Sequence, residues 1–263
     1  MTLAVVGSLS LNRVDGGAPR VGGCPFYAAR AFRALGVRAV ILAKCAAPDR
    51  PTLLPPLVRL GLPVLWRDSR TTAGFSVAYG GDGRRMLVDA VADPWAPHEL
   101  ELGEARWVHA APLTRADFPA ETLAELSRGR RLSLDGQGLV RPGRVGPLEL
   151  DADYDPDVLR FVSILKLAEE EATLLVGGLD DRALRRLGVP EVVVTLGSRG
   201  CVVFADGIAE LVRARRVENA DPTGAGDAFA AAYLAARSRG AAPTAAARRA
   251  SALVADLLAG RVT

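Results

Sequence analysis

The chain has 263 residues, which suffices for one large domain with a full core or for two small ones. Apolar residues make up 49% and charged residues 24% of the sequence, as in an ordinary soluble globular protein, and the formal net charge is only +3. Because the basic residues are dispersed along the chain and no apolar stretch has the length of a membrane span, we expect neither a nucleic-acid partner nor a membrane.

The three cysteines, Cys24, Cys45 and Cys201, lie far apart and form no C-x-x-C motif. With only two histidines in the chain, spacing alone assembles no zinc site. Isolated cysteines of this kind are usually small buried residues of a reduced protein. The first residues also lack the basic and long apolar regions of a signal peptide, so we expect a cytoplasmic protein.

Apolar runs of strand length alternate with amphipathic helical patterns along the chain. In the first part, strands are predicted at 3–6, 38–43 and 63–66, and helices at 25–35 and 53–60. The arms 72–79 and 84–91 flank Gly80-Gly81-Asp82-Gly83 and predict a β-hairpin. Beyond it, the patterns predict strands at 107–110, 131–134, 162–165 and 191–195, helices at 118–126 and 169–176, a hairpin with arms 201–204 and 209–212, and closing helices at 225–236 and 243–258.

This alternation favours an α/β fold with a doubly wound, mostly parallel sheet and helices on both faces. We find no internal repeat, low-complexity linker or break in composition, so a single domain over residues 1–263 is the simplest interpretation. The Pro- and Asp-rich segment 142–155 is expected to be a surface excursion.

The most informative segment is 220–229, Ala-Asp-Pro-Thr-Gly-Ala-Gly-Asp-Ala-Phe, directly before a predicted helix. Glycines at a helix start let backbone N–H groups approach an anion, and the helix dipole adds positive charge there. A carboxylate in the same turn, Asp227, would repel phosphate, and a role as general base for an attacking hydroxyl explains its presence. The competing interpretation is a tight loop with an acid favoured by the dipole; seven ordered positions make it the weaker one. Asp221 could hold metal-bound water or cap the turn.

Asp-Pro-Thr-Gly-Ala-Gly-Asp at 221–227 resembles the D-T-x-G-A-G-D signature of ribokinase-like (PfkB) carbohydrate kinases. The resemblance covers most of the chain. The first strand leads through Gly7 to Asn12, Gly22-Gly23 precedes a helix, 166–171 is similar to K-x-N-x-x-E, and 194–200 is similar to V-T-L-G-x-x-G. There is no Walker A motif and no protein-kinase motif set. The resemblance implies a small-molecule kinase of ribokinase-like fold that uses ATP and Mg²⁺.

The resemblance also implies individual roles. Asp227 would be the catalytic base, with Gly224, Ala225 and Gly226 forming the anion hole. The substrate would contact Asn12, Gly22 and Gly23. The residues assigned to ATP are Lys166, Thr195, Gly197, Thr223 and Ser251. Glu171 would act on Mg²⁺ through water, with Asp221 as the other metal candidate.

Asp135 and Gln137 follow a predicted strand, where open α/β sheets place ligand groups, so both are candidate substrate contacts. A simple polar turn is the alternative. Arg141 could hold a substrate hydroxyl or phosphate, or could be a solvated surface arginine. Lys44 could meet a phosphate or only extend to solvent, His109 fits a core histidine better than a substrate contact, and Cys24 is expected to pack in the core.

Three departures from the family pattern matter. Ala168 replaces the usual Asn or Asp, which alters the metal and phosphate network. Cys-Pro-Phe-Tyr after Gly23 lacks the Lys and Asn with which ribokinases grip a pentose, so ribose is a poor candidate. Only residues 13–21 separate Asn12 from Gly22, which predicts a reduced β-lid, with the hairpin at 72–91 as the remaining cover. We therefore expect a monomer, or a dimer not formed through a β-clasp lid.

A short lid also occurs in compact members of the family such as myo-inositol kinases, which the chain resembles at 69–72, 92–94 and 135–138. The resemblance thus implies ATP-dependent phosphorylation of a sugar or a cyclitol such as myo-inositol. A kinase for a nucleoside, with Phe26 or Tyr27 stacking on the base, or for another hydroxymethyl compound remains the alternative. A non-catalytic nucleotide- or sugar-binding protein of the same fold is the third.

Overall fold

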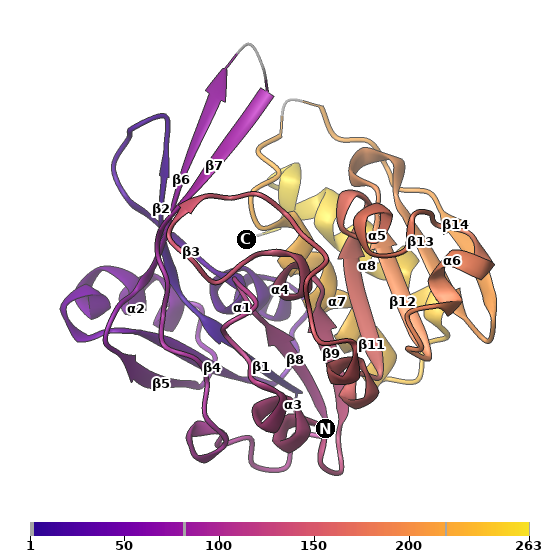
Figure 1. The fold of residues 1–263 in the computed structure, drawn as a ribbon, viewed down its shortest axis with the longest axis horizontal. Coiled ribbons are helices and arrows are strands. Elements are labelled where there is room, and N and C mark those ends of the chain that lie inside the picture. The colour runs from indigo at the N-terminus through magenta and orange to yellow at the C-terminus, as the bar shows by residue number, and fades with distance from the viewer. Residues whose placement is uncertain (1–2, 81–82, 219, 263) are drawn as a thin grey trace.

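A computed structural model describes residues 3–80, 83–218 and 220–262. The chain forms two sheets, and the larger one has nine strands in the order β14-β13-β12-β11-β9-β8-β1-β4-β5 (Figure 1). From β12 across the sheet to β5, neighbouring strands in this order pair in parallel. Strands β13 and β14 add an antiparallel edge beside β12. The strands are β1 (Leu3–Ser8), β4 (Ala39–Ala46), β5 (Val64–Ser69), β8 (Trp107–Ala111), β9 (Arg131–Asp135), β11 (Ile164–Ala168), β12 (Glu191–Thr195), β13 (Cys201–Ala205) and β14 (Ile208–Val212).

Helices cover both faces of this sheet, as the sequence predicts. Alternate side chains of a strand point to opposite faces. In β1, Leu3 and Val5 therefore enter one core while Ala4 and Val6 enter the other. The first core is covered by α1 (Cys24–Ala34), α2 (Arg50–Val58), α7 (Ala225–Ser238) and α8 (Pro243–Leu258), and the second by α3 (Ala120–Ser127), α4 (Gln137–Val140), α5 (Glu169–Val176) and α6 (Asp181–Arg185).

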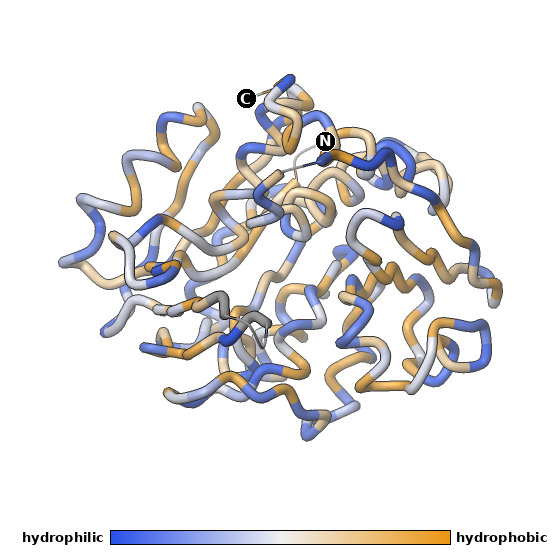
Figure 2. Tube along the Cα trace, turned by 90° about the horizontal axis from the view of Figure 1, so that it is seen from above, coloured by the Kyte–Doolittle hydropathy of each residue, from blue (hydrophilic) through white to orange (hydrophobic). Residues whose placement is uncertain are grey.

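Small side chains explain how a chain with few aromatics fills its core. Residues 228–236 of α7 are all buried, and most of them are alanine. Alanine lets this helix lie close to α8 and α1. Along the trace in Figure 2, hydrophobic stretches are interrupted at short intervals by hydrophilic residues. Within the described part of the chain, no helix is long and apolar enough to cross a membrane.

The smaller sheet has five strands in the order β10-β7-β6-β2-β3 and stands above the larger one (Figure 1). Its strands are β2 (Ser10–Val14), β3 (Arg20–Gly22), β6 (Ala73–Gly80), β7 (Gly83–Ala90) and β10 (Gly146–Pro147). The hairpin β6–β7 is the one predicted from the sequence; Gly81 and Asp82 of its expected turn lie outside the described residues.

The N-terminal hairpin β2–β3 is short, as expected, but the lid to which it belongs is larger than a stub. Strand β2 pairs in parallel with β6, so the two hairpins form one continuous sheet. The segment 142–155 also contributes, because Gly146 and Pro147 pair with β7. The structure thus contains both the short N-terminal hairpin and the cover hairpin, and it adds what the sequence did not predict: segments distant in sequence share one ladder.

Candidate active site

A cleft of about 320 Å³ lies between the lid and the carboxyl ends of the main-sheet strands. Strands β9 and β11 supply Asp135 and Lys166 to it, and the start of α7 supplies Gly226 and Asp227. The predicted contacts Asn12, Gly23, Gln137, Arg141, Glu171, Thr223 and Gly224 line the same cleft. Residues from distant parts of the sequence thus meet at the edge of the sheet where parallel α/β folds bind ligands.

The turn before α7 has the geometry expected of an anion site. Gly224 has φ 75°, and a Cβ there would lie 2.1 Å from the ring of Tyr27, so backbone conformation and packing both require glycine. The N–H groups in the first turn of a helix have no partner within the helix. A Cβ on Gly226 would lie 3.2 Å from Nζ of Lys166, so the bare backbone of Gly226 and an ammonium group face the same small space.

Asp227 lies half-buried beside this turn. Burial and the nearby charge of Asp135 raise its pKa to about 6, against the opposing effect of Lys166. Cys24 is buried as expected, and its thiol also lies close enough to the Asp227 carboxyl group to oppose the rise in the pKa of Asp227. A carboxylate with a raised pKa at a cleft is typical of a general base.

A buried ion pair joins the two central strands of the site. Nζ of Lys166 lies 3.2 Å from Oδ2 of Asp135, whose Oδ1 also accepts from the backbone N–H of Gln137 at 3.1 Å. Although burial opposes it, the charges of Asp135, Glu171 and Asp227 raise the pKa of Lys166. The lysine is therefore cationic next to the turn at residues 224–226, which we call the anion turn.

Glu171 and Asp221, the two metal candidates, lie in different places. Glu171 is buried in the cleft wall, where burial raises its pKa, and its Oε2 accepts from the Ala168 N–H at 2.7 Å. Asp221 accepts from the N–H and the hydroxyl of Thr223 at 3.0 and 2.6 Å, which is the capping role. It lines a neighbouring groove beside Arg20. Among the described residues, no group of three or more His, Cys, Asp or Glu is placed to hold a metal ion.

The predicted substrate contacts differ in what they offer. Gln137 donates its amide to the Pro112 carbonyl at 2.7 Å, which leaves its Oε1 as an acceptor. The Oδ1 of Asn12 and the Nε of Arg141 are buried and have no hydrogen-bond partner among the described residues. Gly22 and Gly23 are required by packing, because a Cβ would lie 2.2 Å from Nδ2 of Asn12 or 2.3 Å from the Ser8 carbonyl, respectively.

A second, mostly apolar groove of about 230 Å³ brings together Thr195, Gly197 and Ser251. It shares Pro222 and Gly226 with the central cleft, so the anion turn separates the two spaces. Lys166, predicted to contact the donor, lies on the cleft side of this turn.

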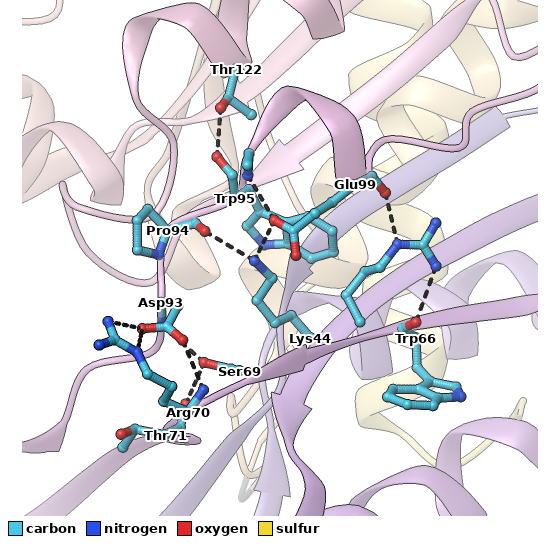
Figure 3. Close-up of polar contacts among 12 residues, drawn as sticks. Lys44, Trp66, Ser69, Arg70, Thr71, Asp93, Pro94, Trp95, Glu99 and Thr122 are labelled. Carbon is cyan, nitrogen blue, oxygen red and sulfur yellow. Dashed lines mark hydrogen bonds and ion pairs between the residues drawn. The ribbon is translucent and has the colours of Figure 1, made fainter.

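Lys44 does not reach the site. It is buried, and its Nζ donates to Glu99 at 2.6 Å and to the Pro94 carbonyl at 2.9 Å above the Trp95 ring (Figure 3). A phosphate-binding role for Lys44 is therefore not supported. The nearby pair Arg70–Asp93 joins the segments that enter and leave the lid hairpin.

His109 is a core histidine, as favoured from the sequence. Its Nδ1 lies 3.0 Å from the Ser133 hydroxyl, and burial lowers its pKa to about 4, so the ring is neutral. Of the two aromatic candidates, Tyr27 lines both the central cleft and the neighbouring groove, while Phe26 lines the groove.

Sequence analysis missed two parts of the site. The Asp135–Lys166 pair gives no local signal, because its members lie on different strands. Leu113 also lines the cleft, and no motif marks it. By contrast, the hairpin at 72–91 was expected to cover the site, and its side chains of Phe75, Val77 and Met86 line the cleft.

Comparison with known proteins agrees with this geometry. The pfkB family carbohydrate kinase model matches residues 68–258. A cytidine kinase of Thermococcus kodakarensis is 30% identical over 152 residues, which cover 55% of this chain and 52% of that protein. The chain spans about half the length of the curated relatives that it matches.

Two solved structures are similar over nearly the whole chain. A pyrophosphate-dependent kinase in the ribokinase family, complexed with a pyrophosphate analog and myo-inositol, has a TM-score of 0.86 and 26% identity, covering 98% of this chain and 95% of the other. A pyrophosphate-dependent myo-inositol-1 kinase, converted into a myo-inositol-3 kinase by mutation, has a TM-score of 0.84 and 26% identity over 97% of this chain and 92% of the other.

Proposed function

This chain belongs to the pfkB family of carbohydrate kinases, and from that premise we propose that it transfers a phosphoryl group to a hydroxyl of a cyclitol such as myo-inositol. One observation carries the proposal. The half-buried carboxylate of Asp227, the bare backbone of Gly226 and the ammonium of Lys166 line one cleft. This combination provides a base for the hydroxyl and positive charge for the phosphoryl group.

Asp227 takes the proton of the attacking hydroxyl as its oxygen forms a bond to phosphorus, while the bond between phosphorus and the donor's bridging oxygen breaks. With a pKa of about 6, Asp227 is mostly ionised at neutral pH and ready to accept that proton. The N–H groups of Gly224 and Gly226 and the ammonium of Lys166 stabilise the charge on the phosphoryl oxygens, whereas the N–H of Ala225 donates to the Pro222 carbonyl at 3.0 Å. The lid limits the access of water to the donor.

ATP is the donor that we propose. The apolar groove lined by Thr195, Gly197 and Ser251 has room for a nucleotide base, and it adjoins the anion turn. Pyrophosphate is the second candidate, because the similar structures are of pyrophosphate-dependent kinases. Mg²⁺ would be held mainly by the donor's phosphates, as is usual for this ion, with Glu171 in contact through water. There it would neutralise charge on the donor.

The walls of the cleft support a cyclitol. Apolar side chains of the lid face a floor of polar and charged groups, which suits a ring whose C–H face packs above while its hydroxyls bond below. In the related myo-inositol-1 kinase, exchange of one asparagine and one serine for leucine converts the enzyme into a myo-inositol-3 kinase. A nucleoside remains the second substrate class, favoured by Tyr27 in the cleft wall and by similarity to a cytidine kinase.

The test is a matrix of acceptors and donors. Purified protein is incubated with myo-inositol, ribose, fructose or cytidine and with Mg²⁺ and either ATP or pyrophosphate, and products are identified by ³¹P NMR. We expect the highest kcat/KM for myo-inositol, with ATP as donor. Preference for cytidine would favour the nucleoside alternative, and preference for pyrophosphate would overturn the proposed donor. If Asp227→Asn matched the wild type, the activity would not arise at this site.

A further inference from the structure

The anion turn depends on a residue that does not select its own conformation. Gly224 has φ 75° and caps α7, because its carbonyl accepts from the Ala228 N–H at 2.9 Å. Glycine adopts negative φ about as readily as positive φ. The bond from the Ala225 N–H to the Pro222 carbonyl, at 3.0 Å, lies within the same turn. A contact from another part of the chain can select the conformation that the turn adopts.

Tyr27 makes such a contact. A Cβ on Gly224 would lie 2.1 Å from Cδ1, 2.2 Å from Cγ and 2.5 Å from Cε1 of Tyr27. These three atoms are consecutive in the ring, so the ring covers the side of Gly224 on which a Cβ would stand. Movement of the turn toward the ring is blocked by close packing, and movement away from it loses van der Waals contact. The ring therefore restrains the turn in both directions.

The ring is itself held by α1. Tyr27 lies in the first turn of this helix, which begins directly after Gly23. The backbone of Gly23 packs on the end of β1, since a Cβ there would lie 2.3 Å from the Ser8 carbonyl oxygen. The ring of Phe26 meets that of Tyr27 edge to face, with centroids 5.3 Å apart. A continuous set of packed groups thus runs from the main sheet to the anion turn.

The hydroxyl of Tyr27 takes no part in this contact. It forms no hydrogen bond within the part of the chain that the structure describes. Burial and the negative charges of Asp227 and Asp221 raise the pKa of Tyr27, so the phenol stays neutral at physiological pH. What Tyr27 offers to the turn is therefore the face of its ring.

On the premise of the proposed kinase function, we propose that Tyr27 is a positioning residue, whose ring holds Gly224 and the N–H groups of the anion turn where they meet the phosphoryl group. Such groups act from fixed positions, and a displacement of about 1 Å at a reaction centre can cost about 10²-fold in rate. This role differs from stacking on a nucleoside base, in which Tyr27 would contact the acceptor. Loss of a stacking partner raises KM for the acceptor, whereas loss of positioning lowers kcat.

Steady-state kinetics on the best acceptor separates these roles. In Tyr27→Ala we expect kcat to fall by about tenfold to a hundredfold, with KM for the acceptor within about threefold of the wild type. Tyr27→Phe keeps the ring and should restore most of the wild-type kcat. Tyr154→Ala is the matched control, because Tyr154 is also half-buried but lines a different cavity. It should leave kcat unaltered. Wild-type kcat in Tyr27→Ala, with or without a raised KM, would overturn the inference.

The contact is also tested without any activity. Gly224→Ala combines an unfavourable φ with a clash against the ring, so it should cost less stability where the ring is absent. In urea denaturation, we expect the midpoint shift caused by Gly224→Ala to be roughly halved in the Tyr27→Ala background and unchanged in Tyr154→Ala. Equal shifts in both backgrounds would overturn the inference. A wild type that phosphorylates no acceptor would overturn the proposed function and the catalytic part of this inference, while the denaturation series would still decide whether the ring holds the turn.

Discussion

Nζ of Lys166 lies 3.2 Å from Oδ2 of Asp135, and both side chains are buried. The pair joins β11 to β9 at their carboxyl ends, where Lys166 and Asp135 are partners in register. It holds a positive charge beside Gly226 and a negative charge near Asp227. The ion pair therefore contributes charges of both signs to the site proposed for phosphoryl transfer.

Breaking this pair should destabilise the fold. Lys166→Met leaves Asp135 buried without its cation, and loss of one partner of a buried pair costs about 3–5 kcal/mol. We expect a drop of that size in the free energy of unfolding, measured by urea denaturation. The double variant Lys166→Met with Asp135→Leu should recover much of the stability, yet stay inactive. Recovery of turnover in the double variant would exclude Lys166 from the reaction.

Replacement of Asp227 by Asn should remove the base without altering the shape of the cleft. Turnover should fall by roughly 10²–10⁴, with little change in KM for the donor. Steady-state kinetics on the best acceptor measures both quantities. Near wild-type turnover would contradict the role of Asp227.

Activity should decline on the acid side of about pH 6. The pKa of Asp227 is raised to about 6, so below that pH the carboxyl group is protonated and no longer accepts a proton. The positive charge of Arg141 lowers this pKa, so Arg141→Gln should move the acid limb of the kcat profile to higher pH, while Arg141→Lys should leave it close to the wild type. A limb that stays in place in Arg141→Gln would argue against this charge effect.

Gly224 and Gly226 should respond differently to alanine. Gly224 has positive φ and contacts Tyr27, so Gly224→Ala should lower stability by about 1 kcal/mol or more. At Gly226 φ is not positive and the added Cβ meets only the end of the Lys166 side chain, 3.2 Å from Nζ, so Gly226→Ala should cost less stability than Gly224→Ala and should lower kcat. Thermal unfolding and kinetics of the two variants separate a structural glycine from a functional one. Full activity in Gly226→Ala would make the turn purely structural.

The sequence predicts the geometry of the turn before α7 well because its parts are contiguous. Residues 221–227 contain the cap, the left-handed glycine, the bare backbone and the carboxylate proposed as the base, and the following helix fixes their geometry. The strands of the main sheet could be predicted equally well, since the buried strands carry continuous apolar runs.

Features that depend on pairing between distant segments could not be predicted. Lys44 looked free to meet a phosphate, because Glu99 lies 55 residues further along the chain. Likewise, nothing local indicates that β2 pairs with β6, so the lid looked smaller than it is. Such contacts depend on how the elements pack against one another. They leave no signal in the hydrophobic pattern within each element, so the sequence does not reveal them.

The burial of both lysines has a practical consequence. The chain has 33 lysine and arginine residues, of which only Lys44 and Lys166 are lysines, and each is buried in an ion pair. Lysine amines, unlike guanidinium groups, are the usual targets of acylation. In the folded protein, acylating reagents should therefore react at a lysine only after the surrounding structure opens. Mass spectrometry of acylated peptides would then follow two openings separately, one around Lys44 beside the lid hairpin and one around Lys166 in the proposed active site.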